Sequence, residues 1–201
     1  MADATENGAG GRGRGRGGVP WLAIVPLVLF VALAGLFGYR LALGGAADAI
    51  PSVLIGRPAP QTDLPALSGV RTPSGEAVEA PVLPDPEGRA AIVNVFASWC
   101  GPCRAEHPEI TALMARPDAV GVGIAYKDDP NASRRFLAEL GNPFERIGVD
   151  PSGRAALDWG ITGVPETFVV APDGRVVHVH AGPVDAAARQ AIEAAIEAAT
   201  R

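Results

Sequence analysis

Cys100 and Cys103 are the residues of this sequence whose type and spacing most directly suggest chemistry. They are the only two cysteines in 201 residues, and Gly101 and Pro102 separate them. Two cysteines three positions apart on the first turn of a helix lie on one face, within the distance that a disulfide can bridge. Such a pair can open and close in place, so the spacing predicts a redox-active dithiol.

The position of the pair predicts different roles for its two thiols. An apolar run ends just before Cys100 and a helix can begin there, so its thiolate gains from free backbone amides and from the helix dipole. These effects lower a thiol pKa from its free value of ~8.5. We therefore expect Cys100 to attack a disulfide, and Cys103, one turn further along, to resolve the mixed disulfide.

Two other readings of the pair stay open at this stage. A zinc site would need both thiols and two of the histidines at 107, 178 and 180. A purely structural disulfide would close a loop of two residues and add little stability. We expect neither, and no cofactor beyond the redox-active Cys100–Cys103 disulfide.

The elements that must hold the pair can be predicted from periodicity and from Pro and Gly breaks. Buried strands are expected at residues 90–96 and 120–126, with a helix from Cys100 to about Arg116 that Pro108 kinks. A second helix is expected at residues 131–140. Next come a strand near Ile147, a short helix at 154–159, strands at 167–170 and 175–180 joined by a turn at 172–174, and a final helix at 184–200. Weak strands or a hairpin are expected at 62–67 and 76–82.

This order predicts an α/β fold with a mixed central sheet and helices on both faces. We expect the domain at residues 56–201, after a linker at 40–55. Residues 19–39 carry no charge and are long enough to span a bilayer core of ~30 Å. A transmembrane helix is therefore predicted there, and a cleaved signal peptide is the alternative.

Charge and cysteine use limit the compartment and the partners. Residues 1–18 form a glycine-rich tail whose three arginines precede the apolar stretch, which predicts a cytoplasmic tail and a domain outside the cytoplasm. The formal net charge is -5, and residues 40–201 carry 14 basic against 20 acidic residues. An acidic domain without a basic patch argues against nucleic acid as a partner. A single cysteine pair suits an oxidising compartment.

Residues 96–103 (Phe-Ala-Ser-Trp-Cys-Gly-Pro-Cys) resemble the active-site segment of thioredoxin-like proteins, and Pro108 stands where that family kinks its active-site helix. More closely, residues 93–108, 126–129, 140–143, 163–168 and 180–182 resemble the DsbE/CcmG-type thiol:disulfide interchange proteins of cytochrome c maturation. The resemblance runs from Gly56 to the end. It implies a thioredoxin-like fold.

The resemblance also implies a biological role. The resemblance implies that this protein crosses the bacterial inner membrane once and has its domain in the periplasm. It reduces the haem-binding cysteines of apocytochrome c, or of a maturation partner that presents them, and a membrane thiol reductase recharges it. A different anchored reductant, for example one serving copper-site assembly, and a non-catalytic docking module are the alternatives.

Further site residues follow from the resemblance alone. It implies that Trp99 shields the dithiol, that Pro165 is cis beside it, and that the Val164 backbone pairs with an extended substrate. It places Glu106 and Glu166 along the groove, where a carboxylate raises a thiol pKa and can relay a proton. It assigns partner selection to the loop Tyr126, Lys127 and Asp128.

Some positions depart from the family pattern or have a plainer reading. Gly101-Pro102 is the pair of general thioredoxins, so the redox potential does not carry over. Asn94 stands where thioredoxins keep a buried Asp, so a relaying carboxylate must come from elsewhere. The plainer reading of Glu106, and also of Glu166, is an ordinary solvated residue. We expect His107 at the surface, and the histidines at 178 and 180 solvated on one face of their strand.

Overall fold

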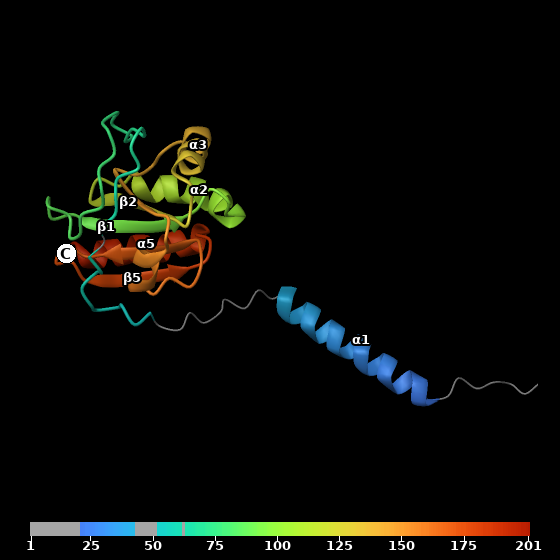
Figure 1. Ribbon diagram of the computed structural model, residues 1–201. Helices are drawn as coiled ribbons and strands as arrows, with labels where there is room; N and C mark the ends of the chain where they lie inside the picture. Colours follow the sequence, from blue (N-terminus) through green and yellow to red (C-terminus); the bar gives the residue numbers. More distant parts are fainter. Residues whose placement is uncertain (1–20, 43–51, 62) are drawn as a thin grey trace, which may run out of the picture. The chain divides into compact units, whose positions relative to one another are not determined.

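The computed structural model describes residues 21–42, 52–61 and 63–201 (Figure 1). The chain divides into two units, Met1–Asp48 and Ala49–Arg201, which are described separately. The predicted tail at residues 1–18 and the linker residues 43–51 lie outside the described residues. Thr62, which begins one of the predicted weak strands, does so as well.

In the first unit, α1 runs from Trp21 to Ala42 with Pro26 inside it. Its described side chains, from Ile24 to Tyr39, are exposed. Among the described residues, no helix combines the length and the apolar character needed to cross a membrane. The anchor expected at residues 19–39 stays a prediction.

The second unit is built on a sheet of strand order β3-β2-β1-β4-β5. Its central strand β1 (Ala90–Phe96) pairs in parallel with β2 (Ala119–Tyr126), which pairs in parallel with β3 (Arg146–Asp150). On its other side β1 pairs antiparallel with β4 (Glu166–Val170), and β4 pairs antiparallel with β5 (Val176–Ala181). The predicted mixed sheet is confirmed, and every residue of β1 is buried.

The helices of this unit are α2 (Gly101–Met114), α3 (Pro130–Leu140), α4 (Arg154–Asp158) and α5 (Ala186–Ala199). Their predicted positions hold to within a few residues. Apolar side chains of α2, α3 and α5 join Ile92 and Phe96 of β1 in one core cluster. The opposite face of β1, with Val93 and Val95, packs in a second cluster with Trp159, which follows α4. The alternation of β1 side chains between two cores fixes which residues face α2.

The ends of α3 show why the sequence stops and starts there. Asp129 caps the first turn by accepting hydrogen bonds from the Asn131 and Ala132 amides at 3.0 Å each, and Pro130 occupies the first helical position. Gly141 follows the last turn with φ +91°, a conformation that favours glycine. The residues on either side of α3 therefore determine where this helix begins and ends.

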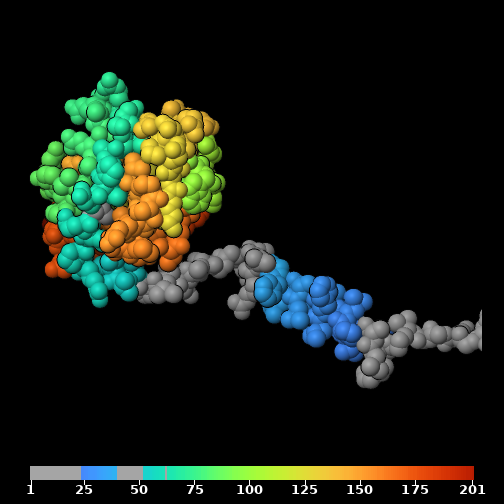
Figure 2. All heavy atoms as spheres, viewed as in Figure 1, coloured from blue at the N-terminus to red at the C-terminus, as the bar shows by residue number. Residues whose placement is uncertain are grey.

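Among the described residues before β1, at 52–61 and 63–89, there is no regular strand, so the strands expected at residues 62–67 and 76–82 are wrong as regular elements. Prolines and glycines interrupt it, and it makes isolated bridges instead, one of which, Arg71 with Ala77, closes a tight turn. It nonetheless runs along both outer strands. The Leu67 amide donates to the Ile147 carbonyl of β3 (3.0 Å), and the Gly56 amide donates to the Val176 carbonyl of β5 (2.8 Å). In Figure 2 its teal atoms cover the outside of the domain beside the gold atoms of α3.

Candidate active site

The Cys100–Cys103 pair lies where β1 gives way to α2. Cys100 is the N-cap of α2 and Cys103 lies in its first turn, and the two sulfurs form a disulfide with a Cα–Cα distance of 5.3 Å. The Cys103 amide donates to Cys100 Sγ at 3.1 Å. Both residues are buried, with 5% of Cys100 and 2% of Cys103 exposed. The helix terminus thus directs an amide at the sulfur that we expect to attack.

The loop before β4 faces this pair. The Val164–Pro165 bond is cis, and Cys100 Sγ lies 3.7 Å from the Val164 carbonyl oxygen. Glu166 is 95% buried and its Oε1 accepts hydrogen bonds from Thr162 N (2.9 Å) and Thr162 Oγ1 (2.8 Å). Its carboxylate is therefore directed at the loop that presents Val164, rather than being free along a groove.

Trp99 stands beside the dithiol and is 60% exposed. Its Nε1 donates to the Lys127 carbonyl at 3.1 Å, so the ring is tied to the loop after β2. Lys127 adopts φ +44° and its amide donates to the Asp150 carbonyl at 2.8 Å. The indole is thus an ordered apolar surface next to the disulfide, at the position where a shield was expected.

Asp128 joins two loops that border the site. Its carboxylate accepts from the Ser98 amide (2.8 Å), the Ser98 hydroxyl (2.7 Å) and the Ser133 hydroxyl (2.7 Å). The residue is 6% exposed. A buried carboxylate with several donors holds its partners firmly. Asp128 therefore fixes the segment leading to Cys100 against the start of α3. Of the three expected loop residues, only Lys127 is exposed, and Tyr126 is half-buried.

Glu106, one helical turn beyond Cys103 on α2, belongs to a buried polar network. It is 2% exposed, so the plainer reading of a solvated helix residue is wrong, and so is a position along an open groove. Oε1 accepts from Asn94 Nδ2 at 3.1 Å, and Oε2 accepts from the Val184 amide at 2.7 Å. Asn94 Nδ2 also donates to Thr167 Oγ1 at 3.1 Å. Asn94 and Thr167 stand opposite each other on β1 and β4.

Burial raises the pKa of Glu106 from 4.5 to about 7, although its hydrogen bonds with Val184 and Asn94 act in the other direction. A carboxyl with a pKa near neutrality exchanges a proton readily at physiological pH. It is placed one helical turn beyond Cys103, on the same side of α2. A buried carboxyl group thus lies on α2 and is hydrogen-bonded to Asn94, the residue that stands where thioredoxins keep an Asp.

The three histidines are less exposed than expected. His107 is buried, and its Nε2 donates to the Gly141 carbonyl at 3.0 Å, so its expected surface position is wrong. Burial lowers the pKa of His107. His178 and His180 are half-buried rather than solvated, and burial also lowers the pKa of His178.

The sequence located most of these residues but not their partners. Thr167, Val184 and Ser133 complete the networks of Glu106 and Asp128, and none of them was expected to. The only sign of the Glu106 network in the sequence was that Asn94 stands where thioredoxins keep a buried Asp. The bonds themselves join residues up to 78 positions apart, which spacing alone does not reveal.

Residues 80–196 match the model of the Redoxin family. The chain is 42% identical over 163 residues to the thiol:disulfide interchange protein DsbE homolog of Paracoccus denitrificans, covering 81% of this chain and 86% of that protein. It is 38% identical over 164 residues to the thiol:disulfide interchange protein HelX of Rhodobacter capsulatus, covering 81% and 88%. Among solved structures, a putative thiol:disulfide interchange protein DsbE from Chlorobium tepidum superposes with a TM-score of 0.58 at 28% identity, over 72% of this chain and 96% of that one.

Proposed function

Because the chain belongs to the Redoxin family and, within it, to the DsbE-type thiol:disulfide interchange proteins, we propose that it reduces protein disulfides during cytochrome c maturation. Its enzyme class, thiol:disulfide oxidoreductase, follows from that membership and from the Cys100–Cys103 pair. The proposed substrate is the disulfide of apocytochrome c or of a maturation partner that presents it. The carrying observation is the placement of Cys100 at the helix N-cap, facing the Val164 carbonyl.

In the proposed reaction the reduced pair donates two electrons. The Cys100 thiolate attacks one sulfur of the substrate disulfide, forms the mixed disulfide and expels the other substrate sulfur as a thiolate. Cys103, once deprotonated, attacks Cys100 Sγ and releases the second substrate thiolate. The substrate gains two electrons and two protons, and the protein is left with the Cys100–Cys103 disulfide seen here. A membrane thiol reductase would then restore the dithiol.

We assign to Glu106 the role of accepting the proton that the Cys103 thiol loses. Cys103 must lose a proton before it can resolve the mixed disulfide, and its site is almost closed to solvent. A carboxyl whose pKa lies near 7 can take that proton and give it up again without a large energetic barrier. This assignment is supported by the position of Glu106 on α2 and by its burial.

The surface around the disulfide supports docking of an extended substrate segment. The Val164 backbone faces Cys100, and the exposed indole of Trp99 provides an apolar contact on the side of the Lys127 loop. An extended segment could add main-chain hydrogen bonds at Val164. Glu166 would act here as a positioning residue, because its carboxylate is bonded to the loop that carries Val164.

We also propose that residues 19–39 anchor the protein in the bacterial inner membrane with its redox domain in the periplasm. Support comes from the uncharged sequence of that stretch and from the arginines before it. The full chain should resist extraction from membranes by alkaline carbonate, whereas a chain lacking residues 19–39 should be released. Release of the full chain would contradict the anchor.

Trapping with Cys103→Ser tests the proposed substrate. Without the resolving thiol, the mixed disulfide through Cys100 should accumulate in cells that make cytochrome c, and mass spectrometry of the material released by dithiothreitol should identify apocytochrome c or a maturation thiol protein. The matched control is Cys100→Ser combined with Cys103→Ser, which should trap nothing. Recovery of only unrelated envelope proteins would refute the role in cytochrome c maturation while leaving the enzyme class intact.

A further inference from the structure

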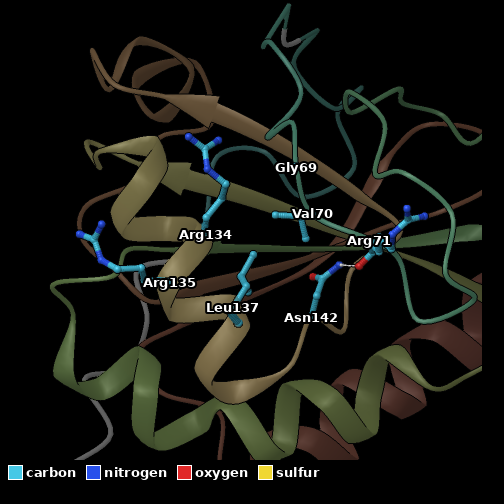
Figure 3. A pocket seen from close by; sticks show the side chains of 8 residues that line it. Gly69, Val70, Arg71, Arg134, Arg135, Leu137 and Asn142 are labelled. Carbon is cyan, nitrogen blue, oxygen red and sulfur yellow. Dashed lines mark hydrogen bonds between the residues drawn. The ribbon is translucent and has the colours of Figure 1, made fainter.

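A pocket with no part in the dithiol site lies between α3 and the loop at residues 69–71. Its volume is about 440 Å³, which is within the range of small-ligand sites, roughly 300–1,000 Å³. Figure 3 shows Leu137 and Val70 inside it, with Arg134 and Arg71 on opposite sides in this view. Val70 is half-buried and Ala138 is exposed, so these two side chains offer apolar surface, and the buried Leu137 closes the pocket beneath them.

Hydrogen bonds across the pocket hold its two walls together. Arg134 Nη1 donates to the Ser68 carbonyl across the pocket at 3.0 Å, while its Nη2 donates to Asn131 Oδ1 at 2.7 Å within α3 and orients the guanidinium group. At the other end, Asn142 Nδ2 donates to the Arg71 carbonyl at 2.9 Å. The loop and the helix are thus tied at both ends, and the pocket is formed before any ligand arrives.

The charge of this pocket is opposite to that of the domain. Its lining includes Arg71, Arg134 and Arg135 and no acidic residue. Among the described residues, none of these three forms an ion pair, although most other described arginines do. Residues 40–201 as a whole carry 14 basic against 20 acidic residues. Each guanidinium has five N–H donors, and Arg134 uses two of its five on the protein.

We propose that this pocket binds a small organic anion, in which a carboxylate or a phosphate is attached to an apolar body. The guanidinium fork of Arg134 matches either oxyanion, and an arginine pairs with both in a bidentate manner. Arg135 and Arg71 add positive charge at the rim. Val70 and Ala138 receive the apolar body of the ligand, with Leu137 beneath them.

Amide chemical-shift titration of the full chain in detergent tests this proposal. The probes are phenylacetate and phenyl phosphate, and phenylacetamide is the neutral comparison at the same detergent concentration. We expect saturable shifts confined to residues 68–71 and 134–142, with phenylacetamide binding at least about tenfold more weakly because it lacks a charge-assisted hydrogen bond. The stronger of the two anions identifies the headgroup.

Two variants and one control complete the test. Arg134→Gln should weaken anion binding by about tenfold or more. Arg135→Gln, which removes charge without removing a hydrogen bond between the walls, should weaken it by a smaller factor. Arg154→Gln removes an exposed arginine elsewhere and should leave binding unchanged. Equal binding of phenylacetamide, shifts outside the pocket, or equal effects of Arg135→Gln and Arg154→Gln would overturn the proposal.

Discussion

Replacing Glu106 by Gln should remove most of one specific pH dependence of stability. Burial raises the pKa of Glu106 from 4.5 to about 7. A carboxyl whose pKa is higher in the folded protein than in the unfolded chain favours folding when it is protonated. Its contribution is therefore complete below about pH 4.5 and is lost as the pH rises to about 7. The difference between the two pKa values corresponds to about 3 kcal/mol in the free energy of unfolding.

The substitution also has a cost that does not depend on pH. Both carboxylate oxygens accept a hydrogen bond, from Asn94 Nδ2 and from the Val184 amide. A glutamine has only one acceptor oxygen, so one of these donors would face its NH₂ group. Loss of one buried hydrogen bond costs about 1–3 kcal/mol. The variant should thus be less stable than the wild type by about 1–3 kcal/mol at pH 4.5, and equally stable or more stable by up to about 2 kcal/mol at pH 8.

Two histidines, the buried His107 and the half-buried His178, change stability in the opposite direction over an overlapping pH range. Burial lowers the pKa values of His107 and His178, so their contributions to stability are lost as the pH falls below about 6.5. The pH profile of the wild type alone therefore mixes opposing slopes. The difference between variant and wild type isolates Glu106, because both proteins keep the histidines.

Urea unfolding of the oxidised protein at pH 4.5, 6 and 8 measures this difference, with the buried Trp159 as a fluorescent reporter. The variant-minus-wild-type difference should change by about 3 kcal/mol between the outer pH values. Glu197→Gln, which changes an exposed carboxylate on α5, should show a constant difference. A pH-independent difference for Glu106→Gln would show that folding does not raise the pKa of this carboxyl.

Three further substitutions test other parts of the structure. Asp128→Ala should lower the free energy of unfolding in urea by about 3 kcal/mol, because it leaves hydrogen-bond donors of Ser98 and Ser133 without a partner. Asp129→Ala should lower it by about 1 kcal/mol, because it removes one helix cap. Equal costs would contradict the role of Asp128 in joining the two loops. Gly148→Ala should cost about 1–3 kcal/mol and speed proteolysis before β1, because its Cβ would lie 2.8 Å from Pro81 Cγ; unchanged proteolysis would contradict this. Trp99→Ala should slow reduction of a protein disulfide by about tenfold without lowering stability by more than ~0.5 kcal/mol, since the indole is exposed; an unchanged rate would remove its docking role.

The sequence predicted those features that local physics determines. The apolar run of β1, the extent of α3 and the cysteine spacing each depend on neighbouring residues, and all are present in the structure. The sequence could not show that Glu106 would be buried, because its position on α2 is compatible with either solvent or core. That outcome depends on Asn94 and Val184, which only the folded chain brings to it.

The irregular segment before β1 failed as a strand prediction for a related reason. Prolines and glycines prevent a continuous ladder, yet short apolar pieces between them still pair with the sheet through single bridges. A hydrophobic pattern in the sequence indicates a continuous strand, and it does not indicate isolated bridges in which single residues pair with the sheet. The cationic pocket was missed similarly, since Arg71 and Arg134 come from segments that the sequence does not relate.

Because that irregular segment lies along both β3 and β5, it also protects the protein from other copies of itself. Unpaired outer strands are templates for intermolecular pairing and aggregation. Here the Leu67 and Gly56 amides occupy carbonyls on the two outer strands, and the frequent prolines keep the segment from offering a new ladder of its own. A shortened chain that began near Arg89 would keep the whole sheet and the disulfide, yet it should be poorly soluble.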